Sequence, residues 1–184
     1  AASEGLKAGG MLPVMKHIPG HGRAMVDSHH DLPIVTASLD ELDAQDFAPF
    51  RALKDEVMAM SAHLVFTAVD PERPATTSPK VIEEIIRGRI GFQGLLLSDD
   101  SSMNALKGTL GERAADIVAG GCDIVLHCNG VMDEMKQVVA RVPELSGEGL
   151  RRAEAAQAAF RPADGTDERA ARAEFWALVS QAQA

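Results

Sequence analysis

Short apolar segments alternate along this chain with segments whose apolar positions recur at helical spacing. The apolar segments cover residues 11–17, 62–69, 95–100 and 122–128, which is the length of buried strands. Between them the clearest helical stripe is formed by the valine and isoleucines of residues 81–90. Four strands separated by helices predict an α/β fold with a parallel sheet.

Cap residues predict where the helices begin. Ser38 and Glu41 have the spacing of a capping box, so we expect a helix from this point to about Met60. Ser78 followed by proline predicts the start of the helix that contains the 81–90 stripe. From Met132 onward the chain is alanine-rich and interrupted by prolines, which predicts a helical tail.

Two architectures fit this alternation. An open doubly wound sheet can close on four or five strands, whereas a (β/α)8 barrel needs eight strands and about 250 residues, so the chain would form half of one. In both, functional groups gather at the carboxyl ends of the strands. This rule selects residues 16–31, 67–70, 99–100 and 127–129 as the candidate site.

Composition and charge narrow the class of protein. The chain has 184 residues, 46% of them hydrophobic, which is enough for one substantial core. A net charge of -9 disfavours nucleic-acid and anionic membrane partners. No apolar run reaches the roughly 20 residues that cross a bilayer, and no signal-peptide pattern opens the chain. Cys122 and Cys128 are expected to be buried free thiols, which favours a reducing cytoplasmic location.

The paired acids at the end of the third apolar run are candidates for catalysis. Asp99 and Asp100 follow Leu95–Ser98, where a barrel enzyme places catalytic carboxylates. Consecutive side chains on a strand point in opposite directions. We therefore expect one of the two to face the site and the other to anchor the neighbouring loop, although a turn or capping role for both is the simpler alternative.

The segment that follows the first apolar run is dense in groups that carry protons near neutral pH. Asp27 and His29 are close enough for the carboxylate to orient the imidazole, as a general acid/base requires, although a solvated turn has the same spacing. Lys16 ends an apolar run, where a cation needs an anion or a hydroxyl-rich ligand. The alternative for this segment is a zinc site formed by His17, His21, His29 and His30 with Asp27 or Asp31 as supporting carboxylates, but we expect no metal and no cofactor.

Together these motifs resemble those of bacterial β-N-acetylhexosaminidases of glycoside hydrolase family 3. The resemblance extends over residues 5–129. Its motifs are Lys16–Gly22, Asp27–His29, Leu32–Pro33, Gly91–Gly94 and Ser98–Met103. It implies that residues 1–145 form the second half of a (β/α)8 TIM barrel and that residues 146–184 form a helical extension.

The resemblance also implies a reaction and roles for individual residues. Asp99 would be the nucleophile of a retaining glycosidase, and His29, paired with Asp27, would be its acid/base. Lys16 and His17 would contact the hydroxyls of N-acetylglucosamine. The implied function is cytoplasmic removal of N-acetylglucosamine from peptidoglycan fragments. Alternatives are transfer of the sugar to phosphate, and an inert sugar-binding or structural half-domain.

The length of the chain departs from the family. The family's barrel begins upstream of Ala1, and that part supplies an aspartate and an arginine that hold the sugar. Half a barrel leaves the first and fourth strands with unpaired edges. We therefore expect either a longer polypeptide, of which this chain is a carboxyl-terminal portion, or a second chain that completes the barrel.

Overall fold

A computed structural model of the protein describes residues 1–28 and 31–182. Within these residues the chain forms a four-stranded parallel sheet in the order β1-β3-β5-β6, with a separate two-stranded parallel sheet of β2 and β4. The predicted α/β fold with a parallel sheet is confirmed. The strands are β1 (Met15–Ile18), β2 (Ile34–Val35), β3 (Met58–Ser61), β4 (Val65–Phe66), β5 (Leu95–Asp100) and β6 (Ile124–Leu126).

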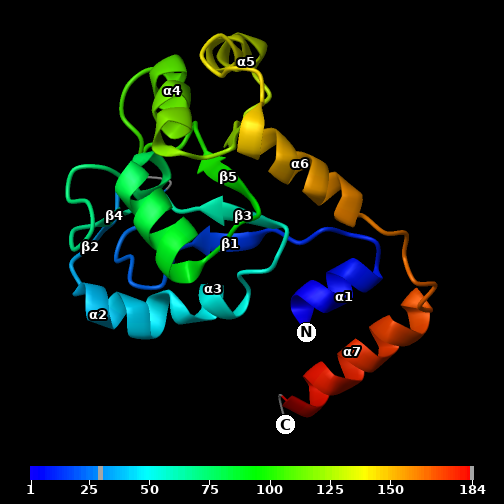
Figure 1. The fold of residues 1–184 in the computed structure, drawn as a ribbon. Helices are drawn as coiled ribbons and strands as arrows, with labels where there is room; N and C mark the ends of the chain where they lie inside the picture. The colour runs from blue at the N-terminus through cyan, green and yellow to red at the C-terminus, as the bar shows by residue number, and fades with distance from the viewer. Residues whose placement is uncertain (29–30, 183–184) are drawn as a thin grey trace.

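Helices lie around the sheet and continue into a tail at the carboxyl end (Figure 1). Helices α6 and α7 run away from the strands on one side, and α1 lies close to the linker between them, where the amide of Asp164 donates to the carbonyl of Ala8 at 2.9 Å. The helices are α1 (Ala2–Ala8), α2 (Leu39–Glu41), η1 (Leu42–Asp46), α3 (Ala48–Ala52), η2 (Ala75–Thr77), η3 (Val81–Ile90), α4 (Leu110–Gly120), α5 (Met132–Val139), α6 (Gly147–Ala159) and α7 (Glu168–Ala182).

The two faces of the sheet differ in burial. On β3, Ala59 and Ser61 are fully buried, and on β5 the same is true of Leu96 and Ser98. At the alternate positions, Met58, Met60 and Leu97 are only partly buried, whereas Leu95 is 7% exposed. Because side chains alternate along a strand, the first face packs against the helices and the second face is more open.

Helix η3 supplies much of the core that covers the buried face. Its predicted stripe is confirmed, because all five of its apolar side chains are at most 2% exposed. The hydroxyl oxygen of Ser78 accepts a hydrogen bond from the amide of Val81 at 3.2 Å, as predicted for the start of this helix. Gly91, in the left-handed region at φ 80°, ends it.

The predictions for β3 and β4 are wrong. The capping box of Ser38 and Glu41 is present, but helical structure ends at Ala52, and residues 58–61 form strand β3 instead of continuing a helix to Met60. The apolar run at 62–69 contributes the short strand β4 rather than a strand of the main sheet. Methionine and alanine favour helices, so pairing with β1 and β5 overrides the local preference of residues 58–61.

A cluster of charged groups joins three elements at the opposite end of the sheet from Asp99. Asp123 accepts hydrogen bonds from Arg87 of η3 at 3.0 Å, from Arg152 of α6 at 2.9 Å and from the amide of Leu96 at 2.9 Å. Arg87 also donates to the carbonyls of Phe92 and Gly94, and its guanidinium lies over the Phe92 ring. The carboxylate thus holds η3 and α6 to the amino end of β5.

The two cysteines have different surroundings, and one expectation for them is wrong. Cys122 is buried and burial raises the pKa of its thiol to about 12, whereas Cys128 is exposed because β6 ends at Leu126. Both are free. Over the part of the chain that the structure describes, no helix combines the length and the apolar character needed to cross a membrane.

Candidate functional site

The first and third apolar runs bring His17 and Asp99 together at the carboxyl end of the sheet. Nε2 of His17 lies 3.5 Å from Oδ2 of Asp99. Their strands are separated by β3, so their backbones are about 10 Å apart at the usual strand spacing, and both side chains lean over the end of β3. The His17 side chain is 28% exposed and that of Asp99 15%, so both stay accessible to a small ligand.

The protonation of His17 suits a hydrogen-bonding role. Burial lowers the pKa of His17 below its usual value, and the negative charge of Asp99 opposes this only in part. His17 is therefore neutral at neutral pH. With its hydrogen at Nε2, the imidazole can donate to the Asp99 carboxylate or to a bound hydroxyl group.

Asp100 faces away from His17 and holds a loop in place. Its Oδ1 accepts hydrogen bonds from the amides of Ser102 at 3.0 Å and Cys128 at 3.2 Å, and its Oδ2 accepts from the Ser102 hydroxyl at 2.6 Å. Partial burial acts to raise the pKa of Asp100, but these hydrogen bonds outweigh it and leave the pKa below its usual value. The carboxylate thus ties the loop after β5 to the loop after β6.

The remaining predicted site residues are Lys16, Asp27 and His29. Lys16 lies next to His17 on β1 and is exposed. Asp27 is exposed in the loop after β1. His29, the predicted acid/base, lies outside the described residues.

A buried polar network that the sequence reasoning missed lies at the end of β3, directly after Ser61. His63 is 0% exposed; its Nε2 lies 3.0 Å from the carbonyl oxygen of Asp100, and its Nδ1 lies 2.9 Å from the hydroxyl of Thr76. Thr76 in turn is 2.8 Å from the Ser61 hydroxyl. A histidine inside the otherwise apolar run at 62–69 was the available signal.

Two further strand-end groups selected by the sequence serve the fold. Asp70 accepts hydrogen bonds from the Ser78 hydroxyl at 2.6 Å and from the amides of Glu72 and Arg73, so it closes the turn before η3. His127 has a side chain only 5% exposed, with Nε2 3.1 Å from the Glu134 carboxylate. Among the described residues, the printed hydrogen bonds and ion pairs of these two groups join them to residues other than Asp99.

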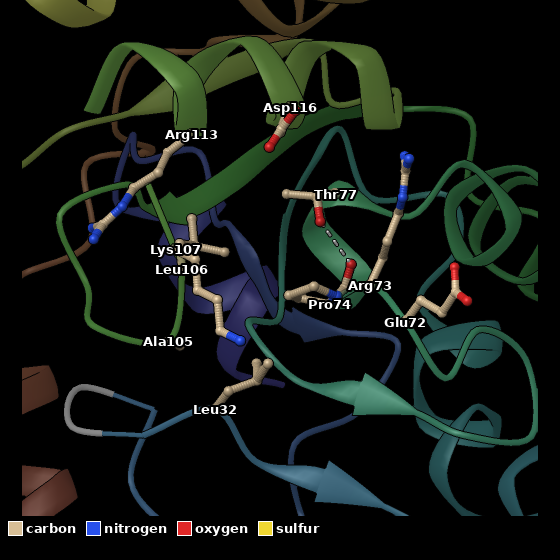
Figure 2. Close-up of a pocket in the computed structure, with 10 residues that line it drawn as sticks. All are labelled: Leu32, Glu72, Arg73, Pro74, Thr77, Ala105, Leu106, Lys107, Arg113 and Asp116. Atoms are coloured by element: carbon tan, nitrogen blue, oxygen red, sulfur yellow. Dashed lines mark hydrogen bonds between the residues drawn. The ribbon is translucent and has the colours of Figure 1, made fainter. Parts of the chain in front are cut away.

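A pocket of about 250 Å³ lies between the loops that follow β1, β4 and β5 (Figure 2). Lys107 points across it toward Leu32, while Arg113 is turned away, donating to the carbonyls of residues 101–103. Both charge signs line the pocket, and none of the predicted site residues that the structure describes, Lys16, His17, Asp27 and Asp99, contributes to it. The pocket is therefore distinct from the His17–Asp99 pair. Among residues 1–28 and 31–182, no three His, Cys, Asp or Glu side chains are grouped as metal ligands.

Several known proteins are similar to this chain in sequence. A curated beta-hexosaminidase of Neisseria gonorrhoeae is 46% identical over 142 residues, which is 74% of this chain and 39% of that protein. One from Chromobacterium violaceum is 40% identical over 147 residues, covering 78% of this chain and 41% of its own length. The chain thus spans about two fifths of the length of these relatives.

Solved structures agree with the sequence relatives. A glycoside hydrolase family 3 beta-N-acetylglucosaminidase from Paenibacillus superposes with a TM-score of 0.76 at 32% identity, covering 86% of this chain and 33% of that one. NagZ from Neisseria gonorrhoeae, in complex with N-trifluoroacetyl-D-glucosamine, gives 0.71 at 38% identity, covering 84% and 44%. Residues 1–161 match the glycosyl hydrolase family 3 N-terminal domain. The chain therefore belongs to the glycosyl hydrolase family 3 N-terminal domain family.

Proposed function

We propose that this chain contains the catalytic residues of a retaining exo-β-N-acetylglucosaminidase. The observation that carries the proposal is the 3.5 Å approach of His17 Nε2 to Asp99 Oδ2 at the accessible carboxyl end of the parallel sheet. A carboxylate with an open face and a neutral hydrogen-bonding neighbour suits attack on a sugar carbon. Similarity to proteins named beta-hexosaminidase and beta-N-acetylglucosaminidase supports the sugar specificity.

The proposed reaction is a double displacement. An oxygen of the Asp99 carboxylate attacks the anomeric carbon, the glycosidic carbon–oxygen bond breaks, and His29 gives its proton to the departing oxygen. Water then attacks the same carbon and gives its proton to His29, which frees Asp99 and releases the sugar. Asp27 would orient His29, and Lys16 and His17 would bind the sugar hydroxyls.

A histidine suits the acid/base role because its usual pKa of about 6.5 needs little tuning at neutral pH. A carboxylic acid would need a raised pKa and would place another negative charge beside an anionic substrate. The resemblance to bacterial β-N-acetylhexosaminidases implies the substrate, and we propose that the enzyme acts in the cytoplasm on peptidoglycan fragments with a terminal N-acetylglucosamine.

The first test is the substitution Asp99→Asn, assayed with an aryl N-acetylglucosaminide. The assay uses the 184-residue chain and also a chimera in which the part of the N. gonorrhoeae relative that the chain does not match is added. Asp99→Asn should reduce turnover by more than about 10³-fold, because the nucleophile is lost. Asp133→Asn, an exposed carboxylate on α5, is the control and should keep full activity.

The products distinguish the alternatives. Release of free N-acetylglucosamine supports hydrolysis, whereas a sugar 1-phosphate formed only in phosphate buffer supports phosphorolysis. Turnover by neither the chain nor the chimera, or unchanged turnover in Asp99→Asn, would contradict the proposal.

A further inference from the structure

His63 is a buried ionisable residue that has no role in the double displacement proposed above. It is fully enclosed at the end of β3, beneath the strand ends that bring His17 and Asp99 together. A buried imidazole is costly unless both of its nitrogens have partners. His63 meets this requirement through the carbonyl of Asp100 and the hydroxyl of Thr76.

The carbonyl of Asp100 determines that Nε2 of His63 carries a hydrogen. A carbonyl oxygen only accepts hydrogen bonds, so Nε2 of His63 carries a hydrogen and donates it to Asp100 over 3.0 Å. This holds whether or not Nδ1 is protonated. Burial lowers the pKa of His63, so the ring is neutral at neutral pH. Nδ1 and the carbonyl of Ala62 each lie 2.9 Å from the Thr76 hydroxyl and compete for its one hydrogen.

The carbonyl that receives this hydrogen belongs to the residue that holds the Asp99 side chain. The amide of Asp100 donates to Oδ1 of Asp99 at 2.9 Å, while the carbonyl of the same residue accepts from His63 and from the amide of Met103 at 3.1 Å. A rotation of the Asp100 main chain would therefore move the Asp99 carboxylate. His63 contacts the main chain from the buried side, and the Asp100 side chain holds it from the loop side.

We infer that His63 is a positioning residue for the proposed nucleophile: its Nε2–H group holds the main chain of Asp100, and the amide of Asp100 holds the Asp99 carboxylate for attack. The inference rests on the proposed function. A neutral imidazole is suited to this task because it supplies a rigid donor without a positive charge that would pair with Asp99 and weaken it as a nucleophile.

The test compares His63→Gln with His63→Met in the form of the protein that shows activity, the chain or the chimera. The two side chains are similar in shape, but only glutamine places a hydrogen-bond donor where Nε2 lies. The substrate is an aryl N-acetylglucosaminide whose leaving group needs no proton, so that its rate reports attack by Asp99. A fluorinated N-acetylglucosaminide that traps the glycosyl-enzyme gives a second measure of the same step.

His63→Met should reduce kcat and the trapping rate by about 10²-fold with little change in KM, because the carboxylate is misplaced while the sugar contacts remain. His63→Gln should recover most of the rate, and the two variants should unfold at similar temperatures. Equal losses in the two variants, full activity in His63→Met, or a loss confined to KM would overturn the inference.

A second pair of variants covers the case in which His63→Met does not fold. Thr76→Val removes the hydroxyl that holds Nδ1, whereas Thr76→Ser keeps it. Thr76→Val should lower kcat more than KM and Thr76→Ser should not, so equal activity of the two would overturn the inference. An unsubstituted protein that neither turns over substrate nor becomes labelled at Asp99 would overturn the proposed function, and this inference with it.

Discussion

Asp99 and Asp100 are consecutive residues with the same side chain, but the two carboxylates have different roles in the structure. The alternation of a strand turns Asp99 toward His17 and turns Asp100 toward the amides of two loops. The first carboxylate keeps an accessible oxygen next to a neutral imidazole, whereas both oxygens of the second accept hydrogen bonds within the protein. Residue type alone does not separate these tasks; orientation does.

Amide substitutions should separate the two aspartates. Asp100→Asn puts an amide where both oxygens now accept hydrogen bonds from donors, so we expect the free energy of unfolding to fall by about 1–3 kcal/mol. Asp99→Asn should change stability much less and remove turnover. Denaturant unfolding and the aryl glycoside assay, applied to both variants, check this. A larger stability loss in Asp99→Asn than in Asp100→Asn would contradict the assignment.

At the scale of the elements, the packing of α4 against η2 depends on a close backbone approach. A Cβ atom added at Gly120 would lie 2.8 Å from the main chain of Thr77, closer than atoms can pack. Gly121 then ends α4 in the left-handed region at φ 107°. The first glycine permits the contact between the two helices, and the second lets the chain turn into β6.

Alanine substitutions at two helical glycines should have opposite effects. In an open position Gly→Ala favours a helix by about 1 kcal/mol, and Gly5 in α1 has nothing within 4 Å of an added Cβ. Gly120→Ala meets backbone, so it should lower the melting temperature despite the same intrinsic gain. Gly5→Ala should leave the melting temperature unchanged or slightly higher. Equal melting temperatures for the two variants would contradict this prediction, because they would mean that α4 and η2 accommodate the added methyl group without loss of stability.

The charged cluster around Asp123 gives a second prediction at this scale. Asp123→Ala leaves Arg87 and Arg152, which are partly buried, without their shared partner, so the free energy of unfolding should fall by about 3–5 kcal/mol. Glu148→Ala removes the partner of Arg151 in an exposed pair and should have no measurable effect. Denaturant unfolding of both variants measures the difference. A loss in Asp123→Ala no larger than in Glu148→Ala would contradict a structural role for the cluster.

For the whole molecule, the buried imidazole of His63 predicts how stability depends on pH. Its pKa in the fold lies below the usual value of about 6.5 that applies to the unfolded chain. Between these two values the unfolded chain binds more protons than the fold, so the free energy of unfolding falls as pH drops below about 6.5. His17 acts in the same direction, since burial lowers its pKa too.

The contribution of His63 can be isolated by substitution. Denaturant unfolding at about pH 7.5 and about pH 5.5 should show a smaller loss of stability on acidification in His63→Gln than in the unsubstituted protein. The residual dependence in the variant reports His17 and the other titrating groups. An unchanged or steeper dependence in His63→Gln would contradict a neutral buried His63.

Much of the fold follows from local sequence signals, and the exceptions have identifiable causes. The capping box at Ser38 and the apolar stripe of η3 are local, so the sequence predicts them. Strand β3 is decided by pairing with its neighbours, and β1 begins at Met15 rather than Met11, after Pro13, which lacks an amide hydrogen. Such tertiary effects are not visible in a single segment.

The candidate site shows the same division. Placing His17 and Asp99 at strand ends follows from the alternation of strands and helices, but their 3.5 Å contact depends on the register of β1 and β5 against β3. The contact of His63 with Asp100 was not predictable, because its partner is a main-chain oxygen that is 37 positions away in sequence and has no residue signature.

The order of strands in the main sheet, β1-β3-β5-β6, follows their order along the chain. Each strand of this sheet therefore lies beside the strand that precedes it in the sheet along the chain, and no later strand lies between two earlier ones. Loop-closure entropy is then spread over several short steps instead of one long closure. Folding intermediates should accordingly gain strands one neighbour at a time, with hydrogen-exchange protection spreading across the sheet in sequence order.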